Sequence, residues 1–226
     1  MKFNKAIVIS LEKSTSRRAR IKEQNINHEF FDAIDGDKLT PEQVRKNTTK
    51  KGYIDCLNNQ QKVFLGAGGI INKKHLGLIL SWCEIVNNID EPSIVMEDDA
   101  VACEDFYKKL NKVYQYIPIS ADLIYLSWNL FKWRHDNPLK NRSIFTEINE
   151  HVSKVKNSIH GTGAIIVNPK CKKSFLSILP AQQAVDHEIP KKLIKTKRVN
   201  AYTLTYFGER LVVNDNLGGS TISSKI

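Results

Sequence analysis

The sequence predicts an α/β fold with a mostly parallel central sheet. Short apolar runs with the composition of buried strands alternate along the chain with segments whose apolar residues recur at helical spacing. This alternation is typical of α/β proteins, in which helices cover the faces of a parallel sheet. Hydrophobic residues make up 41% of the 226 residues, which is enough for a sizeable core. We expect one domain that spans residues 1–226.

The first half of the chain supplies three expected strands and three expected helices. Thr40 followed by Pro41 predicts a helix start, because threonine caps a helix N-terminus and proline suits the first helical position. Later in this half, apolar residues at spacings of three and four predict a helix with one buried face. In chain order, the expected strands are 5–11, 28–35 and 93–96, and the expected helices are 14–24, 39–47 and 76–87.

The second half continues the alternation, with irregular segments between the elements. The expected helices here are 105–116 and 169–179, and the expected strands are 122–128 and 163–167. Residues 45–72 and 132–156 are polar and show no clear periodicity, so we expect long loops or small excursions there. Residues 213–226 are rich in glycine and serine and are expected to form a closing tail.

The composition limits the classes of partner. The formal net charge of +10 favours an anionic partner, such as nucleic acid, an anionic membrane surface or a phosphorylated substrate. The lysines are spread along the chain without forming a basic stripe, so nucleic acid is not expected, and a basic nucleic-acid-binding protein is kept only as an alternative. No apolar run approaches the roughly 20 residues of a membrane helix, and the N-terminus lacks a signal-peptide core. We therefore expect a cytoplasmic protein, at most peripheral at the inner membrane.

A cluster of acidic residues directly follows the expected strand 93–96. Glu97, Asp98 and Asp99 would lie at the carboxyl end of this strand, where ligands bind in open α/β sheets. Three neighbouring carboxylates repel one another, and a divalent cation relieves that repulsion. Hard oxygen ligands suit Mn²⁺ or Mg²⁺, whereas the four cysteines fit no zinc-binding spacing. The other interpretation is a solvated turn or a helix N-terminus.

Several sequence blocks follow one another in a characteristic order. They are VISLEKSTSRRARI, FFDAIDGDKL, HLGLILSWCEIV, IVMEDDA, GTGAIIVNPKCKKSF, AVDHEI and GGSTI. In this order they resemble glycosyltransferase family 25, the lipooligosaccharide β-galactosyltransferase group, while residues 45–72 and 132–156 carry no match. The family usually has histidine directly after the serine of the third block. Here Trp82 follows Ser81, so the role of that histidine is not carried over.

The resemblance implies a GT-A-like nucleotide-sugar-binding fold and an inverting hexosyltransferase. The implied donor is a UDP-sugar, UDP-galactose in the leading interpretation, and the implied acceptor is a sugar of lipooligosaccharide or lipopolysaccharide. A divalent cation, Mn²⁺ or Mg²⁺, is the implied cofactor. A catalytically weak homologue that only binds the sugar nucleotide is the alternative.

The resemblance also assigns roles in the chemistry to residues of the acidic block and of the AVDHEI block. Asp99 and Glu97 are the implied metal ligands, and Asp98 would contact the donor ribose or share the ion. Asp186 would be the catalytic base or contact a sugar hydroxyl, and the alternative role for it is capping a helix N-terminus. His187 would complete the metal shell or orient Asp186, and the alternative is a surface histidine.

Further donor-binding candidates are spread over the other blocks. They are Arg17, Arg18, Asp35, Gly36, Ser81, Thr162 and Ser220. The two arginines would reach the diphosphate or the uracil, and the turn at Asp35 would form part of the pocket wall. Thr162 would lie beneath the site, and Ser220 would close over the diphosphate. A solvated helix face, a tight turn and a frayed terminus are the corresponding alternatives.

Overall fold

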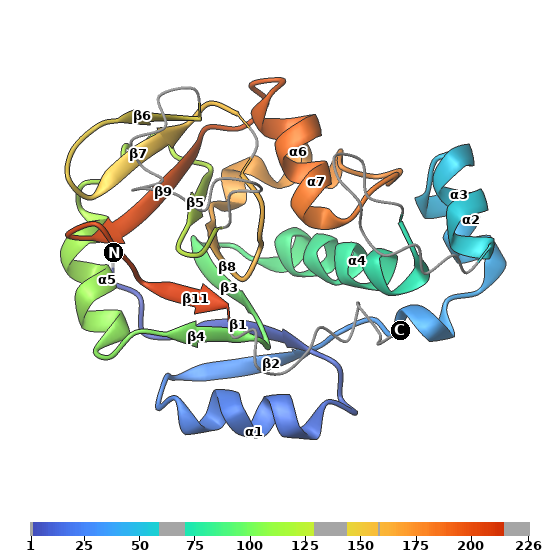
Figure 1. Ribbon diagram of the computed structural model, residues 1–226, viewed down its shortest axis with the longest axis horizontal. Helices are drawn as coiled ribbons and strands as arrows, with labels where there is room; N and C mark the ends of the chain where they lie inside the picture. The colour runs from blue at the N-terminus through green and yellow to red at the C-terminus, as the bar shows by residue number, and fades with distance from the viewer. Residues whose placement is uncertain (1, 59–70, 129–143, 158, 215–226) are drawn as a thin grey trace.

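The centre of the protein is a nine-stranded sheet (Figure 1). The computed structural model describes residues 2–58, 71–128, 144–157 and 159–214. The strand order is β2-β1-β3-β8-β5-β9-β7-β6, and β10 pairs with β9. The strands are β1 (Ala6–Ser10), β2 (His28–Asp32), β3 (Ser93–Glu97), β5 (Leu123–Tyr125), β6 (Phe145–Glu147), β7 (Val152–Val155), β8 (Ala164–Val167), β9 (Ala201–Tyr206) and β10 (Glu209–Arg210). A separate two-stranded ribbon pairs β4 (Ala100–Ala102) with β11 (Val212–Asn214).

Most strands of the central sheet run in the same direction. β1 is parallel to both β2 and β3, and β5 is parallel to β9. β8 lies between β3 and β5 and is antiparallel to both, so β3 and β5 themselves point the same way. The predicted α/β class with a mostly parallel sheet is therefore confirmed. The reversal of β8 has a functional consequence, because the residues that precede β8 lie at the carboxyl end of β3.

Helices cover both faces of the sheet (Figure 1). α1 (Thr15–Glu23) and α5 (Phe106–Tyr114) pack on one face, in a hydrophobic cluster with Ile94 and Met96 of β3. α4 (Lys73–Asn88), α6 (Lys172–Leu176) and α7 (Val185–Ile189) pack on the other face, in a cluster with Val95. Side chains alternate between the faces of a strand, so Glu97 follows Val95 onto the α4 side.

Shorter elements complete the description. α2 (Pro41–Asn47) packs against α3 (Lys50–Leu57) and α4, and the capping box at Thr40 confirms the predicted start of α2. Three short turns of helix adjoin the longer elements: η1 (Gly36–Lys38), η3 (Pro169–Cys171) and the π-helical η4 (Pro190–Ile194).

Two segments expected as loops or small excursions contain regular structure that the sequence did not predict. Residues 45–72 include all of α3, whose N-cap Thr49 accepts a hydrogen bond from Gly52 N. Residues 132–156 include β6 and β7, which pair as an antiparallel hairpin. The strand β9 was also missed, and the expected strand 122–128 is shortened to β5.

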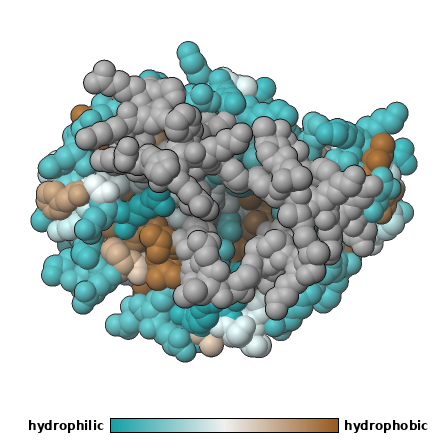
Figure 2. Space-filling view, viewed as in Figure 1, coloured by the Kyte–Doolittle hydropathy of each residue, from teal (hydrophilic) through white to brown (hydrophobic). Residues whose placement is uncertain are grey.

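Two further observations concern the polarity of the surface and the lengths of the helices. Figure 2 shows that hydrophilic residues cover much of the described surface on the face in view. Within the described residues, no helix combines the length and the apolar character needed to span a membrane.

The order in which the chain adds strands to the sheet changes side at β1. It moves from β1 through α1 to β2 on one side, and then returns through α4 to β3 on the other side. Such a switch point leaves a crevice beyond the carboxyl ends of the strands, between the two connecting segments. The residues at these strand ends are the ones to examine for a binding site.

Candidate functional site

A pocket of about 660 Å³ lies at the carboxyl end of β1. Its wall comes from the end of β1, the start of α1, the 33–37 segment, the N-terminal part of α4 and the acidic cluster after β3. The polar residues among its lining are Ser10, Lys13, Ser14, Ser16, Arg17, Arg20, Asp35, Asp37, Lys74, Glu97, Asp98 and Asp99. The pocket is large enough for a nucleotide-sized ligand and carries both cationic and anionic groups.

Asp98 is held toward α1. It accepts hydrogen bonds from Ser10 Oγ at 2.8 Å and from Arg17 Nη1 at 2.6 Å. The Asp98 and Arg17 side chains are each only 12% exposed, so their ion pair is largely shielded from water. Asp98 therefore fixes Arg17 in the pocket wall. Glu97 and Asp99, the chain neighbours of Asp98, also line the pocket.

The segment before η1 forms the opposite wall. Asp35 caps η1 by accepting from Asp37 N and pairs with Lys13 Nζ at 2.6 Å. The Lys13 ammonium holds the pKa of Asp35 below its ordinary value. A Cβ atom on Gly36 would lie 2.1 Å from the carbonyl oxygen of Lys73, so only glycine allows this turn to contact α4 so closely. Asp35 and Gly36 thus line the pocket as expected.

Two of the candidates do not reach the pocket. Ser81 is fully buried, donates to Gly77 O and accepts from Ile34 N, both at 2.8 Å, and so ties the 33–37 segment to α4. Arg18 donates to Ser10 O at 2.9 Å and pairs with Asp32. Neither side chain is part of the pocket lining, so their positions do not support the donor contacts that were expected. Ser220 lies outside the described residues.

Glu97 lies between the pocket and the segment that leads into β8. Its backbone N–H donates to Gly163 O at 2.9 Å, which extends the β3–β8 ladder, and the Thr162 hydroxyl donates to its carboxylate. Burial raises the pKa of Glu97 to about 8, and the nearby charge of Asp99 adds to the effect. The charges of Asp186 and Asp98 act in the same direction. Thr162 is therefore in direct contact with the acidic cluster, and its role beneath a bound donor stays a prediction.

A second cluster of potential metal ligands adjoins Glu97. His160, Asp186 and His187 each offer a ligand atom, and these atoms lie within 4.8 Å of one another. Ala184 holds the N-cap position of α7, so Asp186 is not the cap but part of the first turn. His187 is partly buried and its ring centroid lies 4.6 Å from that of His160, so its role as a metal ligand stays a prediction beside the alternative of a surface histidine. Carboxylate oxygen and imidazole nitrogen are ligands for several divalent metals.

Some residues of the site were missed from the sequence. His160 directly precedes the GTGAIIV segment, but its place in the site depends on the reversed direction of β8, which no local sequence signal indicates. His75 was considered and not assigned; burial lowers the pKa of His75 to about 4, while the charge of Asp186 acts in the opposite direction. Arg20 and Lys74 in the pocket wall were also missed.

The raised pKa of Glu97 predicts how stability depends on pH. A carboxyl whose pKa rises on folding from 4.5 to about 8 makes the folded state bind more protons, so without a cation the free energy of unfolding falls as pH increases between these values. In Glu97→Gln this decline is expected to be weaker than in the wild type, in urea unfolding measured from pH 5 to pH 8. Glu91→Gln, at an exposed position, is the control. Identical pH profiles for the wild type and Glu97→Gln would contradict the burial of this carboxyl.

An open α/β sheet with a charged pocket at its switch point is the arrangement of α/β proteins that bind nucleotides. The model of glycosyltransferase family 25 (LPS biosynthesis protein) matches residues 3–189 of this chain. The chain therefore belongs to that family.

Comparisons with individual proteins add little. No curated protein matches the chain. Among solved structures, apo UDP-glucose pyrophosphorylase is similar at 13% sequence identity and a TM-score of 0.38, over 88% of this chain and 65% of that chain. This chain therefore spans less than two thirds of the length of that protein, and the similarity carries no functional argument.

Proposed function

We propose that the protein is an inverting hexosyltransferase that moves galactose from UDP-galactose to a sugar hydroxyl of a lipooligosaccharide or lipopolysaccharide acceptor. The observation that carries this proposal is the joining of two groups of residues at one rim of the sheet. A pocket with cationic side chains leads to Glu97 and Asp99, and the cluster of Asp186 with two histidines lies beside them. The net charge of +10 supports contact with an acceptor that carries phosphates, at an anionic inner-membrane surface.

The pocket suits the nucleotide diphosphate part of the donor. Lys13, Arg17, Arg20 and Lys74 line it and would offset the negative charge of the phosphates. The ion pair with Asp98 holds the Arg17 side chain in place, so Arg17 is already positioned before the donor binds. Asp35 and Gly36 would form the wall against the nucleoside.

Glu97, Asp99 and His187 are the ligands that we propose for a divalent cation, Mn²⁺ or Mg²⁺. Among the described residues, the group whose ligand atoms lie within 4.8 Å of one another is His160, Asp186 and His187, so His187 is the member common to both sets. The repulsion that raises the pKa of Glu97 is the kind that a bound cation relieves. When bound, the cation supplies positive charge to the leaving diphosphate.

In an inverting transfer, the acceptor hydroxyl attacks the anomeric carbon on the face opposite the diphosphate. The hydroxyl must lose its proton during this step, and we assign its acceptance to the Asp186 carboxylate. The charge of Asp186 contributes to the raised pKa of Glu97, which supports a position of this base near the proposed donor site.

A thermal-shift panel of UDP, UDP-galactose, UDP-glucose and GDP-mannose, each with and without Mn²⁺, tests the donor assignment. Near-saturating UDP-galactose with Mn²⁺ is expected to raise the Tm by about 5–10 °C, the largest shift of the panel. The metal-dependent part of this shift should be absent in Asp99→Ala. Equal shifts in both proteins would remove Asp99 from the metal site, and no shift with any UDP-sugar would overturn the proposed donor.

The anomeric configuration of the product tests the stereochemistry. UDP-galactose is an α-linked donor, so inversion is expected to give a β-linked product, which proton NMR distinguishes by its coupling constant. An α-linked product would contradict the inverting mechanism. Binding of UDP-galactose with no transfer to any lipooligosaccharide acceptor would favour the alternative, a homologue that binds the sugar nucleotide without catalysis.

A further inference from the structure

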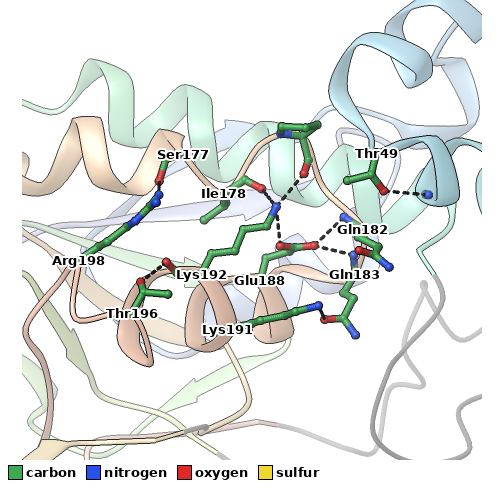
Figure 3. A network of polar contacts seen from close by, with 12 residues as sticks. Thr49, Ser177, Ile178, Gln182, Gln183, Glu188, Lys191, Lys192, Thr196 and Arg198 are labelled. Atoms are coloured by element: carbon green, nitrogen blue, oxygen red, sulfur yellow. Dashed lines mark hydrogen bonds and ion pairs between the residues drawn. The ribbon is translucent and has the colours of Figure 1, made fainter.

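We propose that an ion pair between the buried Glu188 and the partly exposed Lys192 positions Asp186 and His187 for the transfer reaction. This inference rests on the proposed function and adds two positioning residues to it. The Glu188 side chain is 1% exposed, and the Lys192 side chain is 26% exposed. Its Oε2 atom lies 2.9 Å from Lys192 Nζ, one helical turn further along the chain (Figure 3).

The carboxylate of Glu188 holds the chain immediately before α7. Its Oε1 atom accepts from Gln182 N at 2.6 Å and from Gln183 N at 2.7 Å. The N-cap residue of α7 is Ala184, which has no side chain able to cap the helix. Glu188 therefore holds, from inside the helix, the two residues that precede the N-cap, whereas a serine or aspartate cap would bind N–H groups of the first turn. The first turn of α7 is thereby fixed to the preceding loop.

The ammonium group of Lys192 holds the earlier part of the same loop. It donates to Ile178 O at 2.6 Å and to Pro180 O at 2.7 Å. Figure 3 shows the Lys192 ammonium between these carbonyl groups and the Glu188 carboxylate. One ion pair thus connects both ends of the loop that joins α6 to α7.

The opposite edge of this loop is fixed by the connection between α2 and α3. Ala181 N donates to Asn47 O at 2.8 Å, and Thr49 N donates to Ala181 O at 2.9 Å. A Cβ atom on Gly52 would lie 2.7 Å from Ala181 O, so the two backbones are in direct contact. The loop has partners on both sides, and its position determines where α7 begins.

The arrangement of α7 gives this network a role beyond stability. α7 has five residues, too few for a helix to be stable without tertiary contacts. Asp186 and His187 lie in its first turn, while Glu188 points into the interior. A buried ion pair is seldom more stabilising than apolar residues of the same volume, and one use of such a pair is to specify a single arrangement. Here that arrangement places the proposed base and a proposed metal ligand beside Glu97.

Three variants of the full-length protein test the inference. Glu188→Ala is expected to lower kcat by about 10- to 100-fold and to weaken Mn²⁺ binding by a similar factor, while the KM for UDP-galactose changes little. Glu188→Gln keeps an acceptor oxygen for the two N–H groups and should retain more of both properties. Lys192→Met keeps the aliphatic stem and should give the same pattern as Glu188→Ala, which covers the case that Glu188→Ala does not fold. Binding of Mn²⁺ alone is measured from the electron paramagnetic resonance of the free ion.

Asp122→Ala is the matched control, because Asp122 makes a similar set of contacts at the opposite end of β5. Its Oδ2 atom accepts from Asn200 N at 2.7 Å, and its Oδ1 atom lies 3.7 Å from Lys170 Nζ. This variant should lower the Tm without changing kcat or Mn²⁺ affinity. If Glu188→Ala and Lys192→Met also lower the Tm without changing kcat or Mn²⁺ affinity, the ion pair is merely structural and the inference is overturned. If the wild type neither binds Mn²⁺ nor transfers a sugar, the proposed function fails, and the inference fails with it.

Discussion

Replacement of Asp186 with asparagine is expected to lower kcat by about 10³-fold, because the amide has no basic oxygen to take the proton of the acceptor hydroxyl. Asparagine has the same shape as aspartate, so the packing of α7 should be preserved. The affinity for Mn²⁺ should stay close to that of the wild type, since Glu97, Asp99 and His187 are the proposed ligands. Measurement of kcat and of Mn²⁺ binding on the same preparation separates the two properties.

A variant with the same change of charge at a distant position sharpens the test of Asp186. Asp90→Asn, at a side chain that is 96% exposed, makes the same charge change away from the site and should be indistinguishable from the wild type. If Asp186→Asn loses Mn²⁺ binding instead, Asp186 is a metal ligand of the cluster with His160 and His187, and the assignment as base is wrong.

Replacement of Trp82 with histidine, the residue that the family resemblance leads one to expect there, should lower the free energy of unfolding by about 3–5 kcal/mol. Trp82 is fully buried on α4, and its ring stacks on Phe175 with centroids 6.1 Å apart. Histidine would leave a cavity and bury a polar ring. A decrease in Tm of about 10 °C would follow for a chain of this size, as measured by thermal unfolding.

Trp82→Phe is the control for this prediction. Phenylalanine keeps an aromatic ring against Phe175, and it removes an indole N–H that has no hydrogen-bond partner among the described residues. Its cost should be less than half that of Trp82→His, because little volume is lost. A Tm equal to the wild type in Trp82→His would instead mean that the interior beside α4 offers polar partners for an imidazole.

The sequence predicted the elements whose signal is local. The strand β1 is a continuous apolar run, and α4 repeats apolar residues at helical spacing, so both could be placed from composition and periodicity. α3 contains a glycine and has two lysines at its start, and its stability depends on packing against α2, which no local pattern reveals. The strand β6 forms the edge of the sheet and β7 lies next to it, and polar residues interrupt the apolar pattern in both strands.

The residues of the candidate site likewise include some that a local sequence pattern predicts and some that depend on the tertiary fold. Glu97, Asp98 and Asp99 were predictable, because an acidic run after an apolar strand marks the carboxyl end of that strand. The proximity of His160 to Asp186 was not, since it depends on the reversed direction of β8 and on where α7 packs. Ser81 and Arg18 belong to matching blocks, but each is used to join an element to its neighbour rather than to line the pocket.

The position of β9 has a consequence for biosynthesis. This strand follows β5, β6 and β7 in the chain, yet it lies inside the sheet, between β5 and β7. Until it leaves the ribosome, the hairpin of β6 and β7 has no neighbour through which to join the rest of the sheet, and the edge of β5 stays unpaired. Nascent chains therefore expose two strand edges until β9 is synthesised, the stage at which chaperones would protect them from aggregation.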